Sequence, residues 1–392
     1  MNDREPVIVG ALRTPVGKRG GQLQMWHPVD LLGETLHQLV ERAGVDPADL
    51  DDVIVGCVLQ WGQQHGNLGR HAVLAAGLPE SVPAVTIDRQ CGSGQQAVSF
   101  AVDAIKAGTY QLVIGAGVES MSQAPMPPSF IPGSPLGPQY SPRELARYQG
   151  NPLLPQGVSS ELMNQRFGLT REALDAFAVR SHRRAFEATQ AGRLRDQLVR
   201  LTEDPADPHS PAVTADQGIR EHPDAAKMAT LKPAFAPDGA STAANSSQIS
   251  DGAAALLIAS RAYAERHGLK PRARFVSTAV AAADPVIQFT AVLDATRKAL
   301  REAGLDIADI DLFEVNEAFA GVPLMFMQEF GIPDERINVN GGSVAIGHPL
   351  GSTGARMLTD LLCELERRGG RYGLQTICEA SGTANTTIIE RL

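Results

Sequence analysis

ERAGVDPADLD at residues 41–51 recurs as REAGLDIADID at residues 301–311. Two alanines, one glycine and three aspartates keep the same spacing in both copies. Each copy reads as the end of an amphipathic helix at a glycine, where a left-handed C-cap is favourable, followed by an acidic turn. An apolar strand follows each turn, at Val53–Val55 and at Leu312–Phe313. The repeat therefore predicts that one helix–strand unit occurs twice.

The same offset of 260 residues relates a second pair of positions, Gly94 and Gly354. Both glycines lie in glycine- and serine-rich turns that precede a predicted helix. Gly108 is matched by Gly370, at an offset that is two residues longer. Chance similarity between two units would not keep one offset over about fifty residues. The sequence predicts a duplicated domain with pseudo-twofold symmetry, and the seam between the halves is a natural ligand site.

The chain of 392 residues is long enough for two or three domains. Strands that alternate with helices predict parallel sheets with crossover connections. Residues 1–120 and 246–270 are expected to form the first half of the core, and residues 271–392 the second. Residues 121–245 differ, with proline-rich passages around one charged helical stretch at about 171–193, and are predicted to form an inserted loop domain.

The composition limits the classes of partner that are expected for this protein. Acidic residues outnumber basic ones by 44 to 35, for a net charge of −9, which argues against general nucleic-acid binding. The first apolar segment, Val7–Val9, is too short for a signal sequence, and no stretch approaches the roughly 18 apolar residues of a membrane span. A cytosolic protein without nucleic-acid or membrane partners is expected.

The four cysteines are Cys57, Cys91, Cys363 and Cys378, and none forms a CxxC pair. Neither they nor the histidines have metal-ligand spacing, so no metal site is predicted. Free thiols are expected in a reducing compartment. Cys57 and Cys363 read as core residues.

Cys91 lies in DRQCGSGQQAV (residues 88–98), between an apolar strand at Val85–Ile87 and an amphipathic stretch from Gln95 to about Ala107. The glycines allow a sharp bend and a close ligand approach. A helix N-terminus stabilises a thiolate and presents N–H groups to an oxyanion. A lone cysteine is usually a buried structural residue, but this setting favours a nucleophile.

His348 lies in a second glycine-rich turn, NVNGGSVAIGHPLGSTG (residues 338–354), where the following proline restricts its backbone to extended forms. By the duplication this turn is the counterpart of the Cys91 turn, so both should face the seam. His348 is then a candidate base for Cys91. The alternative is a capping or core histidine.

Two further residues lie where strands meet turns. Asn316, in FEVNEAFA (residues 313–320), is either an oxyanion ligand, directly or through a water, or a helix N-cap. Cys378, in QTICEASGTAN (residues 375–385), closes a strand. Two thiols with one imidazole suit chemistry that needs a nucleophile and a separate acid or base, although Cys378 taken alone reads as core.

Taken together, these segments resemble the thiolase family, in order from about Val7 to the C-terminus. The matching motifs include RTPVGK (13–18), GVESMS (117–122) and NEAFA (316–320), and the stretch 338–354 is similar to the family's GHPxGxSG-type signature. The resemblance implies an α/β fold: a duplicated five-layer α-β-α-β-α core with an inserted loop domain.

The resemblance implies CoA-dependent cleavage of a 3-oxoacyl-CoA to acetyl-CoA and a shortened acyl-CoA, or the reverse Claisen condensation. Cys91 would accept the acyl group, with His348 as its base, and Cys378 would handle the α-carbon or leaving-group proton. Asn316, through a water, and His348 would form one oxyanion hole. The backbone N–H groups of Cys91 and Ala380 would form the second.

The resemblance also implies how the co-substrate is bound. The loop domain would hold CoA, with Arg220 near the nucleotide phosphates and Ser247 near the pantetheine; the alternative for Arg220 is a solvated surface charge. No metal or tightly bound cofactor is implied. Thiolases are usually dimers or tetramers, so a homodimer or homotetramer is expected.

Two features depart from the usual family pattern, and a third is similar to one branch of the family. The final turn, usually CxGGG, reads CEASG at residues 378–382, and alanine or serine accepts a positive φ less readily than glycine. Residues 155–157, PQG, stand where many short-chain members carry His-Met-Gly, which leaves the acyl preference open. The C-terminal segment 384–392 and the Gly94-Gln95-Gln96 step resemble degradative thiolases, including those of steroid degradation.

Two other functions are compatible with parts of the sequence. A ketoacyl-ACP synthase-like condensing enzyme would need a Cys-His-His or Cys-His-Asn set, and the presence of Cys378 argues against it. A non-catalytic thiolase-like subunit that binds acyl-CoA or a partner enzyme would fit the altered final turn. All four reactive side chains are present, however, which favours the enzyme.

Overall fold

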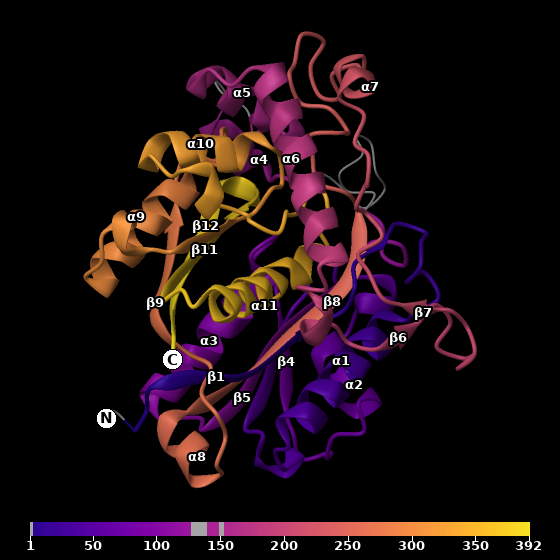
Figure 1. The fold of residues 1–392 in the computed structure, drawn as a ribbon, viewed down its shortest axis with the longest axis vertical. Helices are drawn as coiled ribbons and strands as arrows, with labels where there is room; N and C mark the ends of the chain where they lie inside the picture. The colour runs from indigo at the N-terminus through magenta and orange to yellow at the C-terminus, as the bar shows by residue number, and fades with distance from the viewer. Residues whose placement is uncertain (1–2, 127–138, 149–152) are drawn as a thin grey trace.

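The computed structural model describes residues 3–126, 139–148 and 153–392 (Figure 1). The strands of the first half are β1 (Pro6–Arg13), β2 (Gly17–Lys18), β3 (Asp52–Gly56), β4 (Ala84–Ile87), β5 (Leu112–Ser120) and β8 (Ser250–Ser260). Those of the second half are β9 (Ala273–Ala282), β10 (Leu312–Val315), β11 (Tyr372–Glu379) and β12 (Thr383–Arg391). They form one sheet in the order β10-β11-β12-β9-β1-β8-β5-β3-β4, with β2 beside β8.

The halves join through a short antiparallel contact between β1 and β9, where Val7 pairs with Arg274 and Ile8 with Ala273. The β3–β4, β3–β5 and β10–β11 pairs are parallel, as the alternation of strands and helices predicts. The other pairs of both halves are antiparallel. Each half is therefore a mixed sheet.

Helices cover both halves. On the outer face of the first half lie α1 (Pro28–Ala43) and α2 (Leu68–Ala75), and on that of the second lie α9 (Ala291–Ala303) and α10 (Gly321–Phe330). Between the halves lie α3 (Ser93–Ala107) and α11 (Leu350–Arg368), which contact each other and both half-sheets (Figure 1). The five-layer α-β-α-β-α order is confirmed.

The repeat is visible element by element. Both α1 and α9 end at a left-handed glycine, Gly44 and Gly304, each with φ 65°. A single 3-10 turn then leads into β3 or β10 (Pro47–Asp49 and Ile307–Asp309). In the second half, the counterpart of β4 is reduced to one parallel bridge between Phe313 and Ile337. The duplicated unit predicted from the sequence is therefore present.

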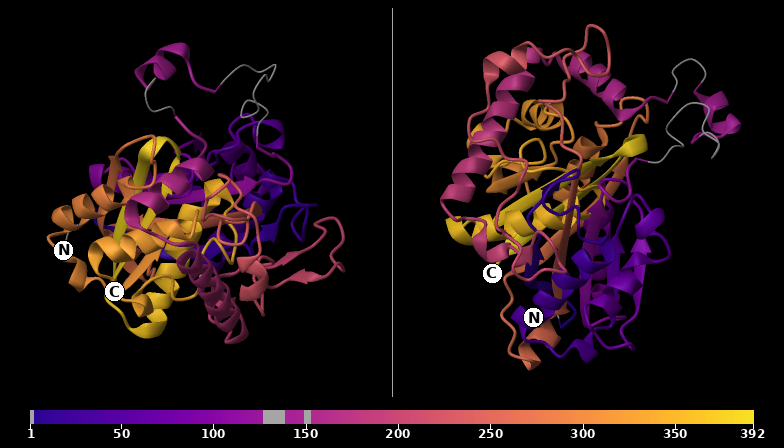
Figure 2. Two further views of the ribbon diagram at one scale, coloured as in Figure 1. Left: turned by 90° about the horizontal axis from the view of Figure 1, so that it is seen from above. Right: turned by 90° about the vertical axis from the view of Figure 1, so that its right-hand side faces the viewer.

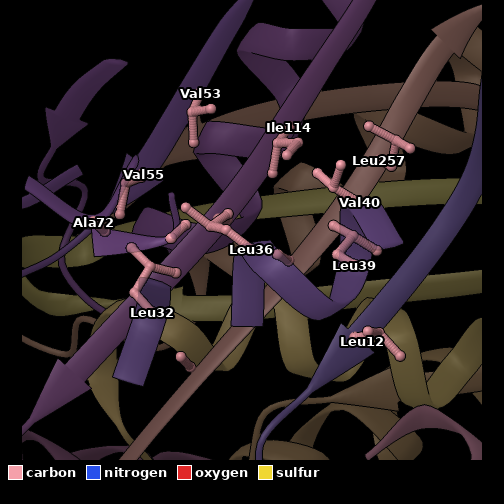
Figure 3. Close-up of a cluster of buried hydrophobic side chains, with 14 of the residues drawn as sticks. Leu12, Leu32, Leu36, Leu39, Val40, Val53, Val55, Ala72, Ile114 and Leu257 are labelled. Atoms are coloured by element: carbon pink, nitrogen blue, oxygen red, sulfur yellow. The ribbon is translucent and has the colours of Figure 1, made fainter. Parts of the chain in front are cut away.

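Alternating strand residues separate the hydrophobic cores. Val53 and Val55 point to the core under α1 and α2, whereas Ile54 points to the core around α3 and α11. Figure 3 shows the first of these cores, in which Leu32 and Leu36 of α1 pack against the strands. A third core lies under α9 and α10. Layers with a core on each side explain why β5 and β8 are buried along their whole length.

The segment between β5 and β8 holds α4 (Pro142–Arg147), α5 (Gln156–Phe167), α6 (Arg171–Gln190), α7 (Ala225–Ala229), β6 (Leu201–Thr202) and β7 (Ala212–Val213). The long helix predicted near 171–193 is confirmed as α6. Figure 2 shows α4 projecting from the body of the molecule. The proline-rich stretch 126–155 lies partly outside the described residues, and the predicted domain boundaries stay a prediction. After β8 comes α8 (Arg261–Arg266). In the described part of the chain, no helix is both long and apolar enough to cross a membrane.

Candidate active site

Cys91 lies in the turn between β4 and α3 and is 4% exposed. The sharp bend falls on Gln90, whose φ of 49° is left-handed, rather than on a glycine. Gly92 has an ordinary φ of −88°, but a Cβ atom there would lie 1.8 Å from Glu379 Oε1. The predicted strand-to-helix turn is confirmed, and its glycine is needed for space instead of for the bend.

His348 lies immediately before α11, and its orientation is fixed on two sides. Its backbone N–H donates to Gln248 O at 3.1 Å and to Ser250 Oγ at 3.2 Å. Its Nδ1 lies 2.7 Å from Thr353 Oγ1, and that hydroxyl donates to Pro349 O at 2.8 Å. Because the hydroxyl proton is used there, the oxygen accepts from Nδ1–H, which leaves Nε2 as the basic nitrogen.

Asn316 follows β10 and faces the imidazole. Its Nδ2 lies 3.4 Å from His348 Nε2, and its Oδ1 accepts from Ser343 Oγ at 2.7 Å. The next helix, α10, begins at Gly321 with Ala320 as its N-cap, so the N-cap alternative for Asn316 is wrong. The amide nitrogen is therefore held beside the ring, as an oxyanion ligand requires.

Cys378 is fully buried near the end of β11, within hydrogen-bonding reach of Asn316. The β11–β12 ladder closes at Glu379, and the turn that follows carries left-handed φ values at Ser381 (63°) and Gly382 (77°). Ala380 has no positive φ, so the cost of replacing the usual glycines falls on Ser381 alone.

A side chain from the β9–α9 loop supports this turn. Gln288 Oε1 accepts from the Ser381 N–H at 3.0 Å, and its Nε2 donates to Leu154 O at 2.7 Å and Ser159 Oγ at 2.9 Å. Gln288 itself has a left-handed φ of 67° and is 3% exposed. These bonds join the turn of Ala380 to the segment that precedes and opens α5.

The seam brings the four predicted side chains together. Cys91 packs with Met357, Ile377 and Leu350, which places it between the first turn of α11, just after His348, and the strand that bears Cys378. Cys91, Asn316 and Cys378 all lie at or just beyond the carboxyl ends of strands, where ligand sites form in α/β folds.

Burial makes this a site of neutral groups. It raises the pKa of the Cys91 thiol well above its ordinary value, and Cys378 and Glu379 raise it further. Burial, and then Glu379, raises the pKa of Cys378 to about 12. Burial and the Arg356 cation lower the pKa of His348 to about 3. An imidazole that stays neutral keeps a free lone pair on one nitrogen, which is the state that a general base requires.

The two residues predicted to contact CoA lie at different depths. Ser247 is half-buried between the loops of Asn316 and His348, and its N–H donates to Ala318 O at 3.0 Å. Arg220 is exposed, and its N–H donates to His182 Nδ1 at 3.2 Å. The structure therefore brings Ser247 to the seam and leaves Arg220 on the surface.

Arg220 is one of two cations that act on the buried His182. Burial and, to a smaller extent, the cations of Arg220 and Lys18 together lower the pKa of His182 to about 4. Two cations thus lie near one buried histidine, a setting that suits an anionic ligand. No group of three or more His, Cys, Asp or Glu side chains in the described ranges could hold a metal ion.

Four polar residues of the site were not predicted from the sequence: Ser343, Thr353, Gln288 and Glu379. Ser343 and Thr353 lie within the glycine-rich stretch of His348, but their hydroxyls follow no pattern that separates them from ordinary turn residues. Glu379 did carry a signal, since a charged residue closes an otherwise buried strand. Gln288 carried none.

Comparison with known proteins agrees with this geometry. The thiolase N-terminal domain profile matches residues 6–262, and the thiolase C-terminal domain profile matches residues 269–391. A steroid 3-ketoacyl-CoA thiolase (FadA6) of Mycobacterium tuberculosis is 46% identical, over 99% of this chain and 94% of that protein. A 3-ketoacyl-CoA thiolase of Bacillus subtilis is 39% identical, over 99% of each. The crystal structure of the Bacillus anthracis acetyl-CoA acetyltransferase superposes with a TM-score of 0.89, at 36% identity over 99% of both chains. The chain belongs to the thiolase family of acyltransferases.

Proposed function

We propose that this thiolase cleaves a 3-oxoacyl-CoA with CoA through an acyl-Cys91 intermediate, and that it catalyses the reverse condensation by the same groups. The observation that carries the proposal is the seam itself, where Cys91 and Cys378 approach the Asn316–His348 pair. A nucleophile, a second acid or base, and two polar groups for an oxyanion are the parts that this reaction requires.

In the first half-reaction, His348 Nε2 takes the proton of Cys91, and the thiolate attacks the 3-keto carbon of the substrate. The C2–C3 bond breaks, and its electron pair passes to the enolate of acetyl-CoA. Asn316, through a water, and His348 stabilise the enolate oxygen. Cys378 then gives its proton to C2, and acetyl-CoA leaves.

In the second half-reaction, the thiol of CoA gives its proton to the Cys378 thiolate and attacks the thioester carbon on Cys91. The tetrahedral oxyanion is stabilised by the backbone N–H groups of Cys91 and Ala380. The sulfur of Cys91 leaves as a thiolate and regains its proton from His348. All groups then return to their starting states.

CoA would enter along the segment that holds Ser247. We assign Ser247 to the pantetheine arm, and Arg220 with Lys18 to the phosphates, because the serine lies at the seam and the cations lie farther out. Ile249 is 43% exposed two residues after Ser247, which gives the same segment an apolar surface.

For the acyl part we propose a degradative substrate larger than acetoacetyl-CoA. The steroid 3-ketoacyl-CoA thiolase at 46% identity supports this choice. Phe235, 39% exposed, packs edge-on against Phe319, three residues beyond Asn316, with ring centroids 5.7 Å apart. A Cβ atom on Gly157 would lie 2.1 Å from the Phe235 ring, so the glycine allows the ring to lie against α5.

We also propose a homodimer or homotetramer. Strand β4 ends the sheet, and the described residues supply no strand beyond it. Val85 on this edge is 42% exposed, and Phe100 on α3 is 43% exposed. An open strand edge with apolar side chains suits pairing with a second copy. The cytosolic location stays a prediction from the sequence.

The test is CoA-dependent loss of 3-oxoacyl-CoA absorbance, with acetoacetyl-CoA and with a steroid-derived 3-oxoacyl-CoA. Cleavage by the wild type that is lost in Cys91→Ala and kept in Cys363→Ala is expected, since Cys363 lies in the last two turns of α11, beside Arg272 and far along the helix from His348. A higher kcat/KM for the steroid-derived substrate would support the proposed class. If neither substrate is cleaved while CoA still binds, the catalytic role is wrong and a binding subunit fits better.

A further inference from the structure

Glu379 is a buried carboxyl group without a partner. It directly follows Cys378 and is 0% exposed. Neither of its oxygens has a hydrogen-bond partner among the described residues. The hydroxyl of Thr383 lies across the ladder and contacts Ala380 O only at 3.5 Å; among the described residues it is the one side chain near enough to donate weakly to the carboxyl group and so to lower its pKa in part. Buried polar groups are nearly always paired, so this exception calls for an explanation.

The carboxyl group lies against the turn of the nucleophile. Oε1 is so close to Gly92 that a Cβ atom there would lie 1.8 Å away, so any other residue would have to displace the carboxyl group. Glu379 thus lies beside Cys91 on one side and follows Cys378 along β11. Its negative charge would raise the pKa of both thiols.

Buried polar side chains line the layer between α3 and the β11–β12 pair. Gln375 donates to Gln95 of α3, and the side-chain oxygens of Gln375 and Asn385 also lack partners in the described part of the chain. Asn385 Nδ2 donates to Gly92 O at 3.4 Å, so this layer reaches the nucleophile turn. An apolar core would be the stable choice at such a position, which indicates that the polar layer serves the site.

Other charged groups face Glu379 or the thiol that it affects. Asp88 and Arg89, in the turn before Cys91, act on the carboxyl group with opposite signs. Glu119 on β5 raises the pKa of the Cys91 thiol. Asp88 is therefore the rival source of any titration in this turn.

We propose that Glu379 is a positioning residue of thiolysis, which stays protonated while Cys91 forms its thiolate and whose ionisation withdraws that thiolate. The proposal rests on the nucleophilic role of Cys91 in the proposed function. Glu379 would join the four reactive side chains and Ala380 as a sixth group of the seam. As an acid, it would set the upper pH limit for formation of the Cys91 thiolate.

The sign follows from the chemistry of the carboxyl group. Burial raises the pKa of Glu379 from 4.5 to about 8; Thr383 and Arg89 lower it in part, and Asp88 raises it. Below that pH the group is neutral and leaves the thiolate unopposed. Above that pH, the negative charge of Glu379 raises the pKa of the nearby Cys91 thiol by about one unit. About tenfold less thiolate is then present at a given pH.

The first experiment measures the rate at which iodoacetamide alkylates Cys91, followed on the Cys91 peptide by mass spectrometry from below to above pH 8. In the wild type the logarithm of the rate should rise with pH, flatten as Glu379 ionises, and rise again. In Glu379→Gln it should rise without a break and end about tenfold above the wild type. A cavity or packing defect would shift the whole curve and would not remove the break.

Asp88→Asn is the matched control, because it removes the other carboxyl group of the turn. The break should remain in this variant, at a slightly lower pH. A break that persists in Glu379→Gln, or that disappears in Asp88→Asn alone, overturns the proposal. Neither outcome depends on turnover, so it is separate from the Cys91→Ala test of the proposed function.

A second measurement detects the carboxyl group itself. In the difference between the wild type and Glu379→Gln, the infrared band of a protonated carboxyl group should fade as the pH is raised through the break in the alkylation rate; the difference removes the bands of Glu119, Glu314 and Glu317, whose pKa values burial also raises. A difference without such a band below the break would show that Glu379 is already ionised there, and the proposal would fail.

Discussion

Gly94 and Gly354, which the duplication relates, lie in backbone contact where α3 meets α11. A Cβ atom on Gly354 would lie 2.3 Å from the Gln95 backbone nitrogen. One on Gly94 would lie 2.6 Å from the Gly351 carbonyl oxygen. The glycines that repeat in the sequence are therefore those that let the two central helices approach each other, just behind the turns of Cys91 and His348.

The Gly354→Ala substitution should consequently destabilise the enzyme. A backbone atom cannot move aside as a side chain can, so the helices must separate, at a cost of about 1–3 kcal/mol in the free energy of unfolding. Denaturant unfolding measures this cost. Gly370→Ala is the control, because its Cβ atom would meet side chains alone, Leu365 at 3.0 Å and Asp311 at 3.4 Å. Equal stability of the two variants would contradict the helix contact.

Thr353→Val should lower kcat and leave the KM for CoA nearly unchanged. The threonine oxygen accepts from His348 Nδ1 at 2.7 Å, and without it the ring is free to take the wrong tautomer or to rotate. We expect a loss of about ten- to a hundredfold in kcat for acetoacetyl-CoA thiolysis, which is less than the roughly hundred- to ten-thousandfold effect of general-base catalysis, because the base itself remains.

Thr359→Val is the matched control for that variant. Thr359 is also buried on α11, and its hydroxyl donates to Ala355 O at 2.9 Å, away from the imidazole. It should retain wild-type kcat. A similar loss in both variants would mean that a valine in α11 disturbs the helix, and that the Thr353 contact is not the cause.

The sequence predicted the site well where a residue type and its setting coincide. Cys91 at a strand-to-helix turn and His348 at its repeat position could be assigned because glycines mark both turns. Asn316 was left open between two roles, since the start of α10 at Gly321 depends on packing, which no local pattern records. Gln288 could not be predicted at all, because its partner Ser381 lies 93 residues away and only the fold brings them together.

Ser381→Gly should stabilise the enzyme. Ser381 holds a left-handed φ of 63°, which costs a residue with a Cβ atom about 1 kcal/mol and costs glycine little. The free energy of unfolding should therefore rise by up to about 1 kcal/mol while thiolysis is kept, because the N–H to Gln288 remains. Ser381→Ala keeps the strain and should show no gain; a gain in the alanine variant would show that the hydroxyl, not the backbone, is unfavourable.

Arg220→Ala should raise the KM for CoA about tenfold or more with little change in kcat, as loss of a charged contact to a phosphate does. Ser247→Ala should raise it less, since a neutral hydrogen bond is weaker than a charged one. The effect of Arg220→Ala should shrink at high salt, because the guanidinium is exposed. Arg301→Ala removes an exposed cation on α9 and should leave the KM unchanged; an equal rise there would indicate only general attraction of the anionic substrate.

Two buried histidines should make the fold sensitive to acid. The pKa of His182 is lowered from 6.5 to about 4 and that of His348 from 6.5 to about 3, chiefly by burial. Between pH 6.5 and 4 the unfolded chain therefore binds two protons at these histidines that the folded chain does not, so their contribution to stability falls as the pH falls, and it is opposed by Glu379, whose pKa is raised to about 8. His182→Gln should remove one of these protons and flatten the dependence by about 1.4 kcal/mol per pH unit at its steepest. Urea unfolding at a series of pH values measures the slope. An unchanged slope would mean that His182 is already protonated in the folded enzyme, and that the cations of Lys18 and Arg220 do not hold it neutral.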